Sequence, residues 1–230
     1  LAAVSLRVDI TPLRSSRDFR LLVSASTVFY LGASIAYVAV PYQIYTLTGS
    51  NTMVGLIGLV ELIPLLISGL WGGALADHVD RQRLLVATGI AQVLFTSVLA
   101  VNAALATPQI WLLFVIAPFL VSASALQRPS REALLPRTVT HDQLPAANAL
   151  GSMGWQFGNL VGPTIGGLLL SSVGASWCFI VDVFGIAIAT SLYARMRRYP
   201  HREQTTPPSF AGILEGVRYA VSRRDLLGTY

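Results

Sequence analysis

Six apolar segments, each long enough to cross a lipid bilayer, dominate this 230-residue sequence. A membrane-spanning helix needs about 20 mostly apolar residues, because the hydrocarbon core of a bilayer is about 30 Å thick. In lipid such a segment satisfies its backbone polar groups by forming a helix. The sequence therefore predicts an all-α integral membrane protein with six transmembrane helices, over residues 21–47, 52–76, 84–105, 110–126, 148–170 and 177–194.

The composition supports a membrane protein over a soluble one. Hydrophobic residues make up 53% of the chain and charged residues 12%, which is too little charge to cover the surface of a soluble domain. The net charge of +5 does not indicate a nucleic-acid partner, because the basic residues stand at the breaks between apolar segments. All of them are arginines. The single cysteine, Cys178, excludes an intrachain disulfide framework.

The distribution of arginine predicts the topology. Arginines occur in a tail over residues 1–20, in the breaks after the second and fourth apolar segments, and after the sixth segment, whereas the other breaks contain none. Because cytoplasmic loops carry the excess of Arg and Lys, both ends of the chain are predicted to lie in the cytoplasm, with the bundle (21–198) in the inner membrane. Residues 199–230 are predicted to form a cytoplasmic linker with an amphipathic helix, which leads towards a seventh span that is not in the chain.

A charged turn joins the second and third apolar segments. Residues 72–83 read Gly-Gly-Ala-Leu-Ala-Asp-His-Val-Asp-Arg-Gln-Arg. This pattern resembles the loop signature of the major facilitator superfamily and is similar to its enterobactin-exporter-like, drug-efflux branch. His78 and Asp80 depart from the commoner Arg and Gly of that signature. The resemblance implies a cytoplasmic gate that is formed by Gly73, Asp77, Asp80, Arg81, Arg83, Arg128 and Arg131. The arginines after the fourth segment either pair with Asp77 or Asp80 or only anchor the helix at the cytoplasmic face.

The fifth apolar segment carries a glycine motif. Its residues Gly158, Gly162, Pro163, Gly166 and Gly167 match a signature that resembles that of the superfamily's proton-coupled drug antiporters. Glycine at every fourth position leaves one helix face without side chains, so that another backbone can approach closely. The alternative is an ordinary packing face, which is common in membrane helices. In this half of a transporter, the bare face is expected to lack its partner and to be free to pair with another copy.

Two acids lie within apolar segments, namely Glu61 and Asp182. A charge at the bilayer centre costs about 2.5–3.5 kcal/mol, which makes each of them a candidate for proton coupling or substrate binding. The alternative is a protonated carboxyl with a purely structural role. Tyr30, Ser34 and Tyr37 share one face of the first segment and are candidates for lining a cavity, although such a stripe also occurs in plain helix packing.

The resemblance implies the N-terminal half of a twelve-helix transporter. The function that we expect is proton-coupled efflux of a small amphipathic compound, a drug or a siderophore, by alternating access. The expected partners are the lipid bilayer, the small-molecule substrate and a C-terminal six-helix half. The alternative is a truncated, non-transporting membrane protein or a structural partner of another bundle. We expect no enzyme activity, cofactor or metal, because the three histidines lie outside the apolar segments.

Overall fold

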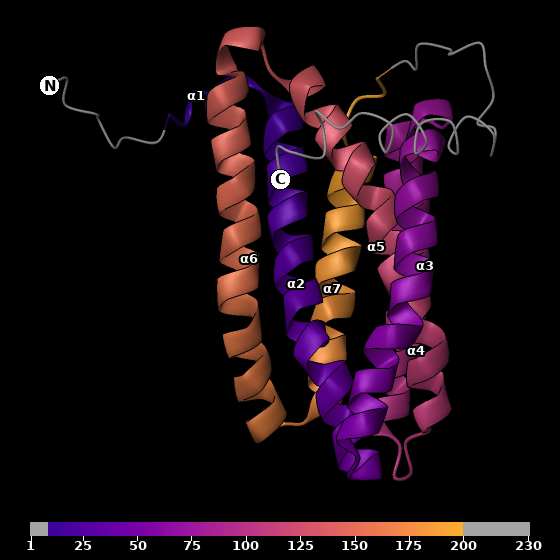
Figure 1. Ribbon diagram of the computed structural model, residues 1–230. Helices are drawn as coiled ribbons and strands as arrows, with labels where there is room; N and C mark the ends of the chain where they lie inside the picture. The colour runs from indigo at the N-terminus through magenta and orange to yellow at the C-terminus, as the bar shows by residue number, and fades with distance from the viewer. Residues whose placement is uncertain (1–8, 200–230) are drawn as a thin grey trace, which may run out of the picture.

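The computed structural model describes the backbone of residues 9–199 and the side chains of residues 9–69 and 79–199. The regular structure of this part is helical throughout (Figure 1). Its elements are α1 (Thr11–Ser15), α2 (Arg17–Thr48), α3 (Asn51–His78), α4 (Arg81–Ala104), α5 (Ile110–Thr138), the short 3-10 turn η1 (His141–Gln143), α6 (Leu144–Ser172) and α7 (Ala175–Ala194). The six long helices cover the six apolar ranges to within a residue, which confirms the predicted all-α, six-helix class. The amphipathic helix predicted near the C-terminus lies outside the described residues.

Five of the described helices are long and apolar enough to cross a membrane, namely α2, the Asn51–Gly69 part of α3, α4, α5 and α7. Helix α6 is equally long but less apolar, because glycines and polar residues such as Asn148, Gln156 and Asn159 interrupt its apolar side chains. Its place in the bundle therefore depends on close packing against a neighbour as well as on apolar composition.

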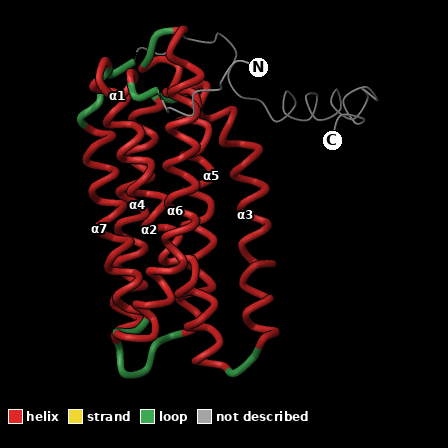
Figure 2. Tube along the Cα trace, turned by 90° about the vertical axis from the view of Figure 1, so that its left-hand side faces the viewer, coloured by secondary structure: helices red, strands yellow, loops and turns green. Residues whose placement is uncertain are grey.

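Short turns force consecutive helices to run antiparallel. Helix α2 ends at Gly49, which adopts a left-handed φ of 64° and donates its N–H to the carbonyl of Tyr45 at 2.7 Å. Gly174, with φ 91°, makes the equally tight turn from α6 to α7. Glycine suits both turns, because it adopts positive φ without the steric cost of a side chain. Figures 1 and 2 show these turns and the α4–α5 loop at the same end of the bundle.

Helix α5 continues beyond the point where the charged residues begin. The sequence predicts a basic segment over residues 127–131 and a cytoplasmic connection over residues 132–147, but α5 runs to Thr138 and α6 begins at Leu144. Pro129 and Pro136 lie inside α5. The connection is thus shorter than the sequence suggests, and the arginines of this stretch project from an ordered helix rather than from a loop.

The six long helices form two consecutive triplets that make equivalent contacts with each other. Helix α2 of the first triplet (α2–α4) packs against α6 and α7, and α5 of the second triplet (α5–α7) packs in the same way against α3 and α4. The remaining large contact joins α4 and α7, each of which is the third helix of its triplet. Inverted three-helix repeats of this kind build each half of a major facilitator transporter. The sequence alone had not revealed this repeat.

The apolar core is divided into two clusters. One contains Leu22, Leu85, Leu134 and Tyr193 and lies near the arginine-bearing ends of the helices. The other, with Ile44, Leu99, Leu113 and Cys178 among its members, lies near the opposite end.

Two buried polar side chains tie the arginine-bearing end together. The Gln82 amide donates to the carbonyls of Tyr193 and Met196, each at 2.8 Å, and so caps the C-terminal end of α7. Asp18 accepts a hydrogen bond of 2.8 Å from the hydroxyl of Tyr199. Burial, followed by this hydrogen bond and the charge of Asp18, raises the pKa of Tyr199 to about 12. Tyr199 is therefore a protonated donor throughout the physiological pH range.

The glycine face of α6 lies against the backbone of α2. A Cβ atom on Gly158 would lie 2.7 Å from Cβ of Tyr30, and one on Gly162 would lie 2.5 Å from Cβ of Ser34. Gly166 meets α2 in the same way. The expectation that this face lacks a partner within the chain is wrong, because α2 already occupies it.

We expect Gly162→Ala to lower the free energy of unfolding by about 1–3 kcal/mol, because the added methyl group overpacks the α2–α6 contact. Gly167→Ala is the matched control, since nothing lies within 4 Å of a Cβ at Gly167. Alanine favours a helix more than glycine does, so the control should be neutral or slightly stabilising. Thermal unfolding of the two purified variants in lipid nanodiscs measures the difference, and equal melting temperatures would contradict the close α2–α6 contact.

Candidate functional site

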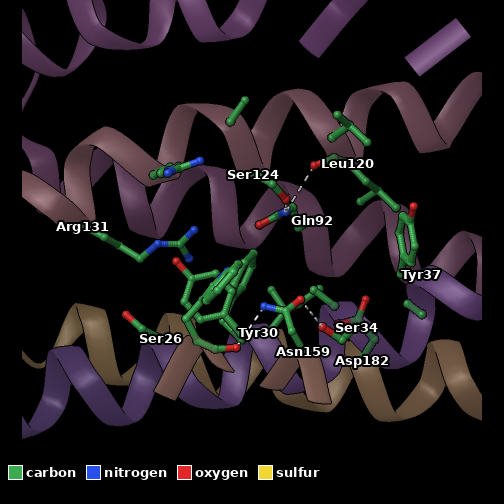
Figure 3. A pocket seen from close by; sticks show the side chains of 18 of the residues that line it. Ser26, Tyr30, Ser34, Tyr37, Gln92, Leu120, Ser124, Arg131, Asn159 and Asp182 are labelled. Carbon is green, nitrogen blue, oxygen red and sulfur yellow. Dashed lines mark hydrogen bonds between the residues drawn. The ribbon is translucent and has the colours of Figure 1, made fainter. Parts of the chain in front are cut away.

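A cavity of about 1090 Å³ is lined by residues from all six long helices (Figure 3). Apolar side chains, such as Leu65, Leu120, Phe179 and Ile186, make up part of its wall. The polar residues that line it are Ser26, Tyr30, Ser34, Tyr37, Glu61, Gln92, Thr96, Ser124, Arg128, Arg131, Glu132, Asn148, Ser152, Asn159 and Asp182. A cavity of this size and mixed lining can hold an organic molecule with both apolar and polar parts.

Helix α2 provides the stripe that the sequence singled out. Tyr30, Ser34 and Tyr37 all line the cavity, and Tyr37 is 75% exposed towards it and the surroundings. The Ser34 hydroxyl donates to the side-chain oxygen of Asn159 on α6 at 3.2 Å. The tyrosines thus lie where a bound molecule can reach them, and their contact with a substrate stays a prediction.

A chain of side-chain hydrogen bonds crosses the wall formed by α4 and α5. Arg131 donates to the oxygen of Gln127 at 3.3 Å, Gln127 donates to Gln92 at 2.6 Å, and Gln92 donates to the hydroxyl of Ser124 at 2.9 Å. The guanidinium can only donate, so it sets the orientation of both amides. This chain was not predicted. Its sign in the sequence is Gln92, an amide in the middle of the apolar range 84–105.

The two acids of the apolar segments face the same cavity but differ in their surroundings. Asp182 is 4% exposed, and its Oδ1 atom has no hydrogen-bond partner within the described residues. Gly32 on α2 makes room for this carboxyl, because a Cβ there would lie 2.7 Å from Oδ1. Glu61 on α3 is half-buried in the cavity wall. The structure therefore brings both acids to one cavity, and their role in proton coupling stays a prediction.

The residues of the glycine motif have two different structural roles. Gly158, Gly162 and Gly166 make the close contact with α2, whereas Gly167 lies away from it. Pro163 lines the cavity. The motif thus brings α6 against α2 and places one of its own residues in the cavity wall.

The predicted gate residues whose side chains the structure describes make separate contacts. Asp80 caps the N-terminus of α4 by accepting the N–H of Arg83 at 3.1 Å. The guanidinium of Arg81 donates to the carbonyl of Ala133 on α5 at 3.5 Å, and Arg83 is exposed. The side chains of Gly73 and Asp77 lie outside the described residues.

The two arginines of α5 have different environments. Arg128 is exposed and forms an ion pair with Glu132 at 3.0 Å. Arg131 is buried, and its guanidinium lies over the rings of Phe29 and Tyr30, at 4.5 Å and 4.9 Å from the ring centroids. Among the described side chains, neither arginine pairs with Asp80. The gate assignment remains a prediction, and this structure contains no latch from α5 to Asp80.

Two packed triplets of long apolar helices around a central cavity define one six-helix half of a major facilitator transporter. The chain belongs to this superfamily and, within it, to the family described as transmembrane secretion effector, whose model matches residues 8–227. It is accordingly a multi-pass membrane protein, as the sequence predicts.

Curated relatives of this chain are exporters. The enterobactin exporter EntS of Salmonella typhimurium (strain LT2) is 26% identical over 216 residues, which cover 94% of this chain and 52% of the exporter. EntS of Shigella boydii serotype 4 and of Escherichia coli O1:K1 are each 25% identical over the same shares of the two chains. This chain thus spans about half the length of the curated relatives that it matches.

Proposed function

We propose that this chain is the N-terminal half of a secondary active exporter that moves small amphipathic compounds out of the cytoplasm. The observation that carries the proposal is the cavity of about 1090 Å³, in which tyrosine, serine and amide groups lie beside apolar side chains. Membership of the transmembrane secretion effector family and similarity to enterobactin exporters support the direction of transport. A siderophore or a drug is the proposed substrate class.

The direct test compares accumulation of candidate compounds in cells with and without the full natural protein, in the presence and absence of a proton uncoupler. We expect lower accumulation in the expressing cells and loss of this difference with the uncoupler. Equal accumulation in both cell lines, across siderophore and drug candidates, would contradict the proposed export.

The proposed mechanism is alternating access, in which this bundle and a second six-helix bundle rock about a shared binding site. Exposed apolar side chains on α3 and α6, including Leu59, Ile63 and Leu160, are available for lipid or for that second bundle. We place the arginine-bearing end at the cytoplasmic face of the inner membrane, because positively charged ends of membrane helices remain inside. Both ends of this chain then lie in the cytoplasm.

Proton coupling is proposed to use Asp182 or Glu61. Asp182 is the stronger candidate, because its carboxyl is buried beside the cavity and has an oxygen without a described partner. A carboxyl in such a place favours its neutral, protonated form. It could therefore take up a proton in one state of the cycle and release it in the other.

We expect Asp182→Asn, Glu61→Gln or both to make efflux independent of the pH gradient, because the amide keeps the shape of the side chain but cannot titrate. Glu132→Gln is the matched control, since Glu132 also lines the cavity but is exposed and paired with Arg128. Efflux from everted vesicles at several pH gradients measures the effect. Normal pH dependence in both acid variants would assign the coupling to groups outside this chain.

Asp77 is proposed to act in the cytoplasmic gate, on the strength of its position in the charged turn. We expect Asp77→Asn to lower the efflux rate at least about fivefold, the lower end of typical coupling energies, without loss of membrane insertion. Asp80→Asn should have a smaller effect, because asparagine caps a helix as well as aspartate does. Efflux rates normalised to protein in the membrane test both variants, and a normal rate for Asp77→Asn would remove the gating role.

The alternative function is that of a non-transporting membrane protein or a structural partner of another membrane bundle. We expect the 230-residue chain alone to insert in the membrane without transporting, because one wall of an alternating-access site is absent. Co-expression with a matching C-terminal half should restore efflux. Uphill transport by the reconstituted chain alone would instead indicate that two copies form the transporter.

A further inference from the structure

Arg131 is a buried cation without a carboxylate partner. Its side chain is 7% exposed, and among the described residues it forms no ion pair. Its one hydrogen bond goes to the neutral amide of Gln127, and its Nε atom has no partner there. A buried charge is normally paired, because removing it from water is costly. Arg131 therefore has an unused capacity for an anion.

The nearby carboxylates do not fill this capacity. Glu132, on the same helix, is bound to Arg128. Asp182 and Glu61 line the same cavity but make no ion pair with Arg131. The Gln127 amide that does bind Arg131 is itself held by Gln92, so it fixes the guanidinium without neutralising it.

The surroundings of Arg131 indicate what kind of anion it would take. Its guanidinium lies over the rings of Phe29 and Tyr30, and Figure 3 shows it pointing towards Tyr30 from the α5 wall of the cavity. Stacking uses a face of the planar group and leaves its N–H edge, which matches the two oxygens of a carboxylate. The adjoining aromatic and aliphatic lining suits a ring or another apolar body.

We propose that Arg131 is an anion-binding subsite of the cavity and takes the carboxylate, or a comparably acidic oxygen, of an aryl substrate. The proposal rests on the proposed export function and narrows its substrates to organic anions. It gives Arg131 a task different from that of a gate residue, because its contacts lie in the cavity wall rather than with Asp80.

The test uses the full natural protein in lipid nanodiscs and two probes of equal size, 2-naphthoate and the neutral 2-naphthamide. Calorimetry at pH 7 should show that the wild type binds the carboxylate about tenfold more tightly than the amide, as expected for a charge-assisted bidentate contact. Arg131→Gln and Arg131→Met should abolish this preference and keep the binding of 2-naphthamide, which reports an intact cavity. Arg137→Gln is the matched control, because Arg137 lies on the same helix and is exposed but does not line the cavity, and it should keep the preference.

The proposal is overturned if the wild type shows no preference, if Arg137→Gln abolishes it, or if either Arg131 variant retains it. If Arg131→Gln and Arg131→Met both lose 2-naphthamide binding as well, the carboxylate preference of Arg131→Lys tests the proposal instead. A preference reduced at least threefold would support the subsite, since lysine lacks the planar N–H edge, and an unchanged preference would overturn it. Binding does not require transport. An Arg131-dependent preference without efflux would therefore refute the proposed export and leave the subsite supported. Efflux of neutral compounds without the preference would refute only the subsite.

Discussion

The close contact between α2 and α6 is the interaction on which the rest of the structure depends. Lipid offers no hydrophobic driving force between helices, so association relies on van der Waals packing and on interhelical hydrogen bonds. The glycine face of α6 brings its backbone against Tyr30, Ser34 and Val38 of α2. The same contact joins the first triplet to the second. It also fixes the position of Ser34 and Asn159, which bridge the two helices at the cavity wall.

Buried polar side chains occur along the whole length of the helices, from Asp18 and Gln82 at the arginine-bearing end to Gln43 and Asn102 at the opposite end. The hydrogen-bond chain from Arg131 to Ser124 and the buried carboxyl of Asp182 lie in the wall of the cavity. Such groups cost free energy when they are buried without partners, and an oxygen of Asp182, a nitrogen of Arg131 and the hydroxyl of Thr96 lack described partners. These three side chains line the cavity.

Much of the fold follows from the sequence. Apolar length located all six long helices, since crossing lipid leaves few alternatives to a helix, but it missed the extension of α5 to Thr138. Regular glycine spacing identified the bare face of α6. The site was only partly predictable. Tyr30, Ser34, Glu61 and Asp182 were recognised because polar residues are rare in apolar segments. Gly32 and Gln127 escaped notice, because their importance comes from neighbours on other helices.

What the sequence determined by itself is the class of the protein: six apolar segments, arginines confined to alternate breaks, and two intramembrane acids. These are local properties, and each is set by the solvent that surrounds a single segment. The tertiary structure alone decided which helix occupies the glycine face, that α5 continues through its prolines, and that Arg131 turns into the cavity instead of pairing with Asp80. Those outcomes depend on contacts between segments far apart in the chain. A single segment could make such contacts with several different helices, and only the assembled bundle selects one of them.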